Sequence, residues 1–221
     1  MLEELTSGES IETLRKALNT TQEGKRLVRN YDAFQNIRPG SSVWFGIYAK
    51  TGFYTNGLDD IEWIVLEVRN GKALLLSRYA LDCRAFDENG QTTMWNNCTV
   101  RSWLNDEFIK RAFSDAEKTK IITTMVSGSN YATQDKVFLL DSKEAKMYFA
   151  SAPARQCSPT KYTAERGWLG SSEYCDWMLR SPALSKGTID TVAESGFINE
   201  YGLSVGYKRA VRPAMWIDLN A

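Results

Sequence analysis

Residues 61–79, IEWIVLEVRNGKALLLSRY, contain two β-prone runs separated by a tight turn. The first run, residues 61–68, contains Ile, Val, Leu and Trp, and the second run, residues 72–79, contains Ala, three Leu and Tyr. Asn70 and Gly71 between them readily take the positive φ values of a two-residue hairpin turn. The stretch therefore predicts an antiparallel β-hairpin at the start of the main domain.

The segments around this hairpin mix strand and helix patterns. Residues 43–48, VWFGIY, have the β-branched and aromatic make-up of a strand. Apolar residues recur at helical spacing in residues 100–113, and the capping boxes at residues 114–117 and 141–144 each predict the start of a helix. A short apolar strand is predicted at residues 137–140. This order differs from a regular βαβ repeat, so we predict an α+β fold with antiparallel sheets and flanking helices.

Short strands are predicted to close the chain. Residues 177–182, WMLRSP, form one apolar run, and residues 189–194 and 197–199 flank a turn at residues 195–196. Residues 211–219 alternate in the manner of a single terminal strand.

The first residues have a different pattern. In residues 10–34 apolar side chains recur every three or four positions, which predicts a helical face, and Gly24 is expected to divide two short helices. Pro39 then interrupts the pattern. We therefore divide the chain into a helical lead-in, residues 1–38, and an α+β domain, residues 39–221.

Charge and hydropathy argue against two classes of partner. Lys+Arg and Asp+Glu are balanced at 27 each, so no overall positive field gathers nucleic-acid phosphates or anionic lipids. No apolar run approaches the roughly 20 residues of a membrane span, and the acidic start lacks the pattern of a signal peptide. We expect a cytoplasmic protein that binds neither nucleic acid nor membrane.

The cysteines and the absence of histidine limit the cofactor chemistry. The sequence has no histidine, and Cys83, Cys98, Cys157 and Cys175 are scattered without a Cys-x-x-Cys pair. We expect buried, reduced thiols, no metal and no cofactor. The alternative for an exported protein is a disulfide between Cys83 and Cys98, which flank a polar loop predicted at residues 82–97.

Most catalytic classes lack their residues. Without histidine there is no Ser-His or Cys-His pair, and no glycine motif of the phosphate-binding types occurs. Two alternatives remain open in the polar loop, namely a calcium site and a carboxylate pair, Asp87 and Glu88, acting on glycan or peptide. A solvated surface turn is the simpler expectation.

Three arginines, Arg101, Arg180 and Arg212, lie within two residues of a Trp, Leu or Pro that is expected to be buried. Their planar sets of N–H donors can tie down loop carbonyls or clamp the carboxylate of a ligand. We expect the first role for all three, and we also keep Arg180 as a candidate ligand contact.

Several blocks of the sequence, taken in order, resemble an uncharacterised bacterial domain that is abundant in gut Firmicutes. The blocks include IEWIVL (61–66), ALLLS (73–77), WNNCTVRSWLN (95–105), DKVFLL (135–140), WMLRSP (177–182) and VRPAMWI (211–217). The resemblance runs from about residue 39 to residue 219, and the family brings no established activity.

The end of the chain has a strand at WMLRSP (177–182), a short hairpin and a final strand at VRPA (211–214). This order is similar to the C-type-lectin-like fold shared by formylglycine-generating enzymes and the variable proteins of diversity-generating retroelements. This second resemblance implies a compact core that displays an irregular ligand-binding surface of loops between Trp168 and Arg209. The chain departs from the pattern at Met178, where a second tryptophan is common. It also lacks the cysteine pair of a formylglycine-generating oxidase and the Tyr- and Asn-rich final hairpin of a diversified surface.

We therefore predict a non-catalytic ligand-binding or protein-interaction module with a lectin-like scaffold, whose ligand is a protein or a glycan. The candidate ligand contacts are Trp168, Tyr174, Arg180, Asn199, Tyr201, Tyr207 and Lys208. The alternative is a cofactor-free hydrolase that uses carboxylates such as Asp87 and Glu88. The sequence leaves the oligomeric state open.

Overall fold

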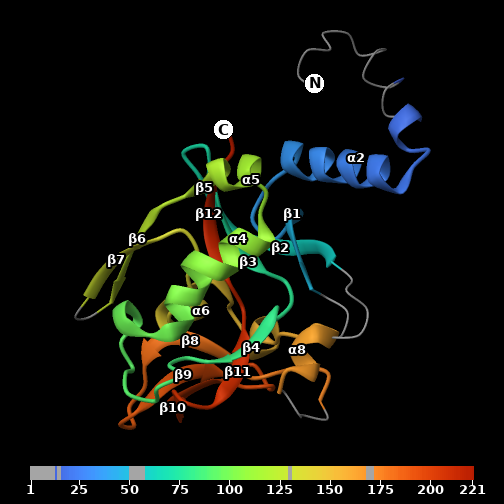
Figure 1. Ribbon diagram of the computed structural model, residues 1–221. Helices are drawn as coiled ribbons and strands as arrows, with labels where there is room; N and C mark the ends of the chain where they lie inside the picture. The colour runs from blue at the N-terminus through green and yellow to red at the C-terminus, as the bar shows by residue number, and fades with distance from the viewer. Residues whose placement is uncertain (1–12, 14–15, 50–57, 129–130, 168–171) are drawn as a thin grey trace.

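The computed structural model describes residues 13, 16–49, 58–128, 131–167 and 172–221. These residues form two five-stranded sheets, called here the upper and the lower sheet after their places in Figure 1. The upper sheet has the order β1 (Ser42–Ala49), β2 (Leu58–Arg69), β3 (Lys72–Ser77), β12 (Ala214–Asp218) and β5 (Ile121–Ile122). The lower sheet has the order β10 (Ile198–Ser204), β9 (Thr188–Val192), β8 (Trp177–Pro182), β11 (Lys208–Val211) and β4 (Asp82–Ala85). A separate hairpin, β6 (Thr124–Gly128) and β7 (Tyr131–Asp135), projects from the side of the upper sheet.

Helices cover the sheets, so the fold is α+β with mainly antiparallel sheets, as predicted. The helical segments are α2 (Gln22–Gln35), the 3₁₀ turn η1 (Trp95–Asn97), α3 (Thr99–Trp103), the π-helical turn η2 (Leu104–Phe108), α4 (Ile109–Ala112), α5 (Asp115–Lys120), α6 (Ser142–Tyr148), α7 (Ala152–Arg155) and α8 (Lys161–Glu165). Both predicted capping boxes are present: Ser114 and Glu117 cap α5, and Asp141 and Glu144 cap α6.

The predicted hairpin is confirmed as β2 and β3. Asn70 and Gly71 have φ values of 50° and 69°, the positive values that a two-residue turn of this kind requires. The strand predicted at residues 137–140 is wrong, because only Phe138 pairs there, in an isolated bridge with Ala214.

One long ribbon connects the two sheets. Strand β3 pairs with β12 in the upper sheet, and their continuations β4 and β11 pair in the lower sheet, antiparallel in both cases. Two bonds bridge the bend between the sheets, from Ser77 N to Pro213 O and from Leu81 N to Val211 O, each of 2.9 Å.

This ribbon corrects two predictions. Residues 211–219 are not one strand, because the chain leaves the lower sheet at Val211 and enters the upper sheet at Ala214. Pro213 has no N–H to donate, so only its carbonyl takes part in the pairing at the bend, where it accepts from Ser77 N. The predicted loop at residues 82–97 begins as strand β4, because β11 supplies the partner edge that the local sequence does not reveal.

Helix α2 packs on β1 at the edge of the upper sheet. The rings of Phe34 and Phe45 meet edge to face with centroids 6.4 Å apart. Gly24 lies inside α2 and does not divide two helices as predicted. A Cβ atom at Gly24 would come within 1.8 Å of Leu18 O, so the glycine permits a close backbone approach.

The core lies between the sheets and the helices. Its aromatic centre includes Trp63, whose indole N–H donates to Phe45 O at 2.7 Å and whose ring stacks on Phe113. Trp95 and Trp177 are also fully buried. These tryptophans are therefore packing residues, which was the expected use of most of them.

Candidate functional site

The outer face of the upper sheet carries Trp216 in the middle of β12. Its neighbours Met215 and Ile217 are 0% and 1% exposed in the core, so strand alternation turns Trp216 to the opposite face. Leu74 of β3 and Ile122 of β5 are its cross-strand partners. Trp216 and Leu74 are themselves buried, at 8% and 3% exposure, and they belong to the core cluster, so the indole forms the edge of the core on this face of the sheet.

Two cations from the β2–β3 hairpin stand beside this indole. Arg69 and Lys72 are opposite each other in the register, and the guanidinium carbon of Arg69 lies 4.9 Å from the centroid of the Trp216 ring. Glu67 positions Arg69, with 3.1 Å between Glu67 Oε1 and Arg69 Nε. The hydroxyl of Tyr148 donates to Glu67 Oε2 at 2.6 Å. Burial and this hydrogen bond raise the pKa of Tyr148, so the phenol keeps its proton and remains a donor.

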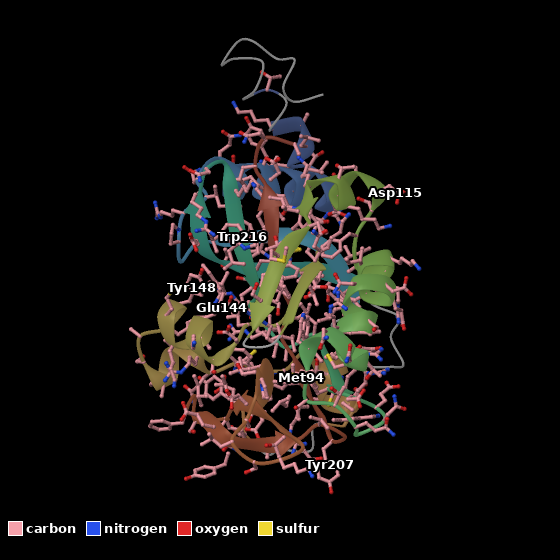
Figure 2. The ribbon with its side chains drawn as sticks, turned by 90° about the vertical axis from the view of Figure 1, so that its left-hand side faces the viewer. Met94, Asp115, Glu144, Tyr148, Tyr207 and Trp216 are labelled. Carbon is pink, nitrogen blue, oxygen red and sulfur yellow. The ribbon has the colours of Figure 1, made fainter. Side chains whose placement is uncertain are left out.

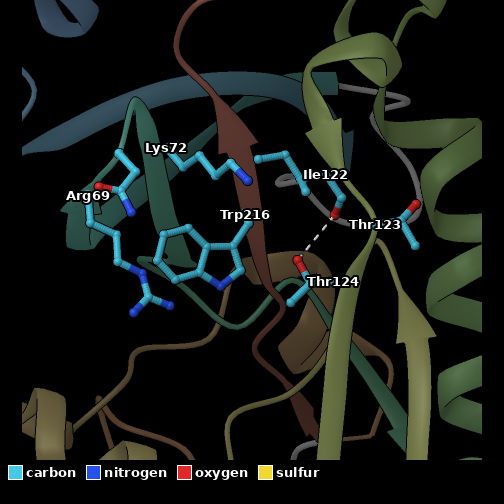
Figure 3. Close-up of a pocket in the computed structure, with 7 residues that line it drawn as sticks. Arg69, Lys72, Ile122, Thr123, Thr124 and Trp216 are labelled. Carbon is cyan, nitrogen blue, oxygen red and sulfur yellow. Dashed lines mark hydrogen bonds between the residues drawn. The ribbon is translucent and has the colours of Figure 1, made fainter.

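Two cavities meet at Trp216. The first, of about 360 Å³, is lined by Arg69, Asn70, Lys72, Ile122, Thr123, Thr124 and Trp216, and Figure 3 shows it between the hairpin turn and the β5–β6 connection. The second, of about 320 Å³, lies between β6, α6 and the same indole. They share Arg69, Thr124 and Trp216. We call the combined depression the Trp216 groove.

The end of the groove next to α6 is a closed polar network around Arg180. The guanidinium of Arg180 donates to Leu139 O at 2.7 Å, to Asp141 Oδ2 at 2.9 Å and to Glu144 Oε1 at 3.1 Å. Asp141 and Glu144 are the capping box of α6, so one set of carboxylates both starts the helix and binds the arginine. These bonds connect β8, Leu139 and the start of α6, and they give this end a fixed shape.

The opposite end of the groove keeps unused cationic groups. Lys72 forms no ion pair with any residue in the described ranges, and the Arg69 side chain is 63% exposed with only Nε engaged by Glu67. Terminal guanidinium nitrogens and an ammonium group are thus free to bind a carboxylate or another anion.

A strand edge borders the same groove. Among the described strands, β6 pairs only with β7, and Thr124–Ser127 of β6 line the second cavity. Figure 3 shows β6 with one edge toward Trp216 and β7 on its far side. The N–H and C=O groups on that edge have no ladder partner in the described residues, which is the condition under which an extended chain adds a strand.

The predicted ligand contacts lie mostly elsewhere. Asn199, Tyr201, Tyr207 and Lys208 belong to β10, β11 and their connection in the lower sheet, where Tyr201 and Tyr207 are 73% and 66% exposed. The Asn199 side chain closes a tight turn with the backbone of Gly202. Figure 2 places Tyr207 at the far end of the molecule from Trp216, so this face is separate from the groove.

Three more predicted positions have different environments. Tyr174 is half-buried before β8, and Trp168 lies outside the described residues. Arg180 lines the Trp216 groove but is 3% exposed and bound to protein groups. Its bond to Leu139 O ties down a loop carbonyl as expected, whereas Arg101 donates to Asn96 O in the turn η1 and Arg212 donates to Ser77 O at the end of strand β3.

Sequence reasoning missed Arg69, Lys72 and Trp216 as a group. The signal available was the pair of cations flanking the Asn-Gly turn, because a two-residue hairpin places such residues opposite each other on one face. Their distance from Trp216 in sequence concealed the contact.

The carboxylates considered for hydrolysis have structural partners or face solvent. Asp87 is 2% exposed and accepts hydrogen bonds from Gln91 N and Thr92 N, at 2.8 and 3.2 Å. The Glu88 side chain is 67% exposed. In the ranges that the structure describes, no group of three or more Cys, Asp or Glu side chains is arranged to hold a metal ion.

All four cysteines are free and buried. Burial and the charge of Asp82 raise the pKa of Cys83 to about 11. Burial also raises the pKa of Cys98, to about 12. Neither thiol is therefore ionised at neutral pH, and no disulfide joins them.

Comparisons with known proteins identify a family and no relative of known activity. None of the helices in the described part of the chain is long and apolar enough to cross a membrane. No curated protein and no solved structure matches the sequence. A family model with the description "Domain of unknown function (DUF6273)" matches residues 70–219, which is more than half of the chain and includes the turn at Asn70, β3, β12 and Trp216. The chain belongs to this DUF6273 family.

Proposed function

We propose that this chain is a non-catalytic binding module that holds an extended, acidic segment of a protein partner in the Trp216 groove. The observation that carries the proposal is the unpaired edge of β6 beside the free cationic groups of Arg69 and Lys72. A peptide strand would add to β6 through its backbone, and an Asp or Glu side chain would reach the two cations.

A protein segment fits the groove better than a glycan. Sugar rings bind to proteins by stacking on an open aromatic face, whereas the guanidinium of Arg69 already lies over the Trp216 ring. A row of backbone donors and acceptors on β6 matches a peptide, whose own backbone repeats at the same spacing.

The scaffold in this proposal is C-type-lectin-like. Its support is the closing sequence of strands, in which β8, the β9–β10 hairpin, β11 and β12 follow in order and β12 returns to the upper sheet between β3 and β5. The exposed lower-sheet face with Tyr201 and Tyr207 would then be a second contact surface, opposite the groove. We place the module in the cytoplasm as part of the same proposal, in keeping with its free thiols.

The hydrolase alternative has weaker support. Asp87 is buried and holds its own loop together, and the Glu88 side chain faces solvent, so neither is set in a cleft as a catalytic pair would be.

A peptide array tests the proposal. Extended peptides with one or two Asp or Glu residues are compared with versions in which these become Lys, at low and at moderate salt. We expect wild-type protein to bind the acidic set and Lys72→Glu to weaken binding by about tenfold, since about 1.4 kcal/mol lost at one contact corresponds to that factor. Lys161→Glu, an exposed lysine on α8 outside both cavities, is the matched control. Equal binding of both peptide sets, or equal loss in both variants, would reject the groove.

Hydrogen exchange tests the strand addition directly. Saturating acidic peptide should slow exchange at those backbone amides of Thr124–Gly128 that point away from β7, because new inter-strand bonds protect them. If binding occurs while these amides exchange at the free rate, the peptide does not lie along β6.

A further inference from the structure

Cys157 and Cys175 form a buried pair of thiols close to the bend between the two sheets. Cys175 N donates to Cys157 O at 2.8 Å, so the two α carbons are no more than about 7 Å apart, near the range that a disulfide spans. The single proton of the Cys175 thiol is shared between Cys157 O, at 3.2 Å, and the sulfur of Cys157. The Cys157 sulfur also lies 3.6 Å from Arg78 O and 3.6 Å from Ser158 O. Cys157 and Cys175 are 2% and 0% exposed.

A buried arginine adjoins this pair. Arg212 is 1% exposed, and its guanidinium lies 4.9 Å from the ring centroid of Trp177 and 5.5 Å from that of Phe149. Its Nε donates to Ser77 O at 2.9 Å, and its Nη1 has no hydrogen-bond partner within the described ranges.

Arg212 makes no ion pair with a carboxylate in those ranges, although an isolated buried cation is strongly unfavourable. A thiolate at Cys157 would supply the missing negative charge.

The two thiols differ in acidity. Burial opposes ionisation of Cys157, but the hydrogen bond from Cys175 and the charge of Arg212 outweigh it and lower the pKa of Cys157. The hydrogen bond to Cys157 and burial raise the pKa of Cys175, and Asp176 adds to this. Cys157 is thus the better nucleophile and Cys175 the proton donor beside it.

We propose that Cys157 and Cys175 are an oxidation site at which a small hydroperoxide converts the dithiol to a disulfide. In the first step the Cys157 thiolate attacks one peroxide oxygen; an S–O bond forms, the O–O bond breaks, and the leaving oxygen takes a proton. In the second step the sulfur of Cys175 attacks Cys157; the S–S bond forms, and the S–O bond breaks with loss of water. The dithiol loses two electrons and the peroxide gains them.

This inference is independent of the proposed ligand. The other buried thiols of the chain are the controls for the oxidation of Cys157 and Cys175. Cys98 is buried like Cys175, and its thiol likewise lies 3.2 Å from a carbonyl, that of Trp95. Its pKa is raised and no second thiol hydrogen-bonds to it, so Cys98 should resist the same oxidant.

Peptide mapping tests the proposal. Reduced native protein is treated with hydrogen peroxide, denatured, alkylated and digested with trypsin, which places the four cysteines on separate peptides. We expect peptide 156–161 linked to peptide 167–180, with Cys83 and Cys98 alkylated. A bulky aromatic disulfide reagent should leave Cys157 and Cys175 unmodified in the folded protein, because only a small oxidant reaches them. Recovery of both as alkylated thiols after peroxide treatment, or a link from either to Cys83 or Cys98, would overturn the proposal.

Two variants sharpen the result. Cys175→Ser should abolish the link and leave Cys157 as a sulfenic acid, which a cyclic 1,3-diketone traps when the peroxide-treated protein is unfolded in its presence. Cys98→Ser should form the 157–175 link to the wild-type extent. Failure to trap a sulfenic acid at Cys157 in folded Cys175→Ser would show that Cys157 is not the attacking sulfur. If Cys175→Ser does not fold, the wild-type map still decides whether the link forms.

Discussion

Gly46 shows how one residue adjusts a strand to its neighbours. It has φ of 73° and lies at an irregularity in the β1–β2 register, between Trp44 and Ile47. The N–H of Gly46 donates to Glu117 Oε1 at 2.9 Å, and an added Cβ would lie 2.5 Å from the Phe113 ring. Conformation and space therefore both select glycine here.

Gly46→Ala should lower the free energy of unfolding by about 3 kcal/mol, from backbone strain and from crowding of Phe113. Gly40→Ala is the matched control, because Gly40 also has positive φ, of 86°, but has no heavy atom within 4 Å of its added Cβ. We expect about 1 kcal/mol for this control. Chemical denaturation measures both, and equal losses would mean that crowding at Phe113 contributes nothing.

Asp190 should make stability depend on pH. It is 5% exposed, and burial raises its pKa in the folded state above the unfolded value. The folded protein therefore holds this proton more tightly, and its contribution is fully present below the unfolded pKa and lost as pH rises through the folded pKa. Asp190→Asn should be more stabilising, relative to wild type, at about pH 7 than at about pH 4. Unfolding midpoints at the two pH values check this; a larger gain at the lower pH would contradict the sign.

At the scale of elements, the capping boxes do more than start helices. Glu117 caps α5 through Ser114 and also accepts from Gly46 of β1, and Glu144 caps α6 and also binds Arg180 of β8. The local pattern predicted the helix starts correctly, whereas the bonds to distant strands were not visible in it.

Glu117→Ala should lower the free energy of unfolding by about 2 kcal/mol, because it removes a helix cap and leaves the Gly46 N–H without its acceptor. Glu107→Ala removes an exposed i,i+4 pair with Arg111 and should cost less than about 0.5 kcal/mol. Thermal unfolding of the two variants provides the comparison. Similar losses would show that Glu117 acts only as a surface charge.

At the scale of the whole molecule, the helical lead-in and the two sheets contribute separately to the stability of the fold. Helix α2 contacts β1 through Phe34 and through Arg29, whose guanidinium lies 4.3 Å from the ring centroid of Trp44. Gly40 N and Ser41 O already bond to Val65 of β2, so the upper sheet begins next to the predicted boundary at residue 39.

A chain of residues 39–221 should therefore fold cooperatively without the lead-in. We expect its melting temperature to fall by about 5–10 °C, because uncovering the contacts of Phe34 and Arg29 loses about 2–3 kcal/mol in a domain of this size. Calorimetry and circular dichroism measure this change. Loss of the cooperative transition would show that residues 1–38 are part of the core unit.

Sequence alone determined the elements whose signals are local. The Asn70-Gly71 turn, the two capping boxes and the balance of charge depend on neighbouring residues or on composition, so they could be predicted without a partner strand. Tertiary structure alone decided that residues 211–219 divide between two sheets, that β6 leaves an open edge, and that Arg69 and Lys72 meet Trp216. Those features depend on pairing between segments far apart in the chain, and the local pattern of apolar residues does not specify which segments pair.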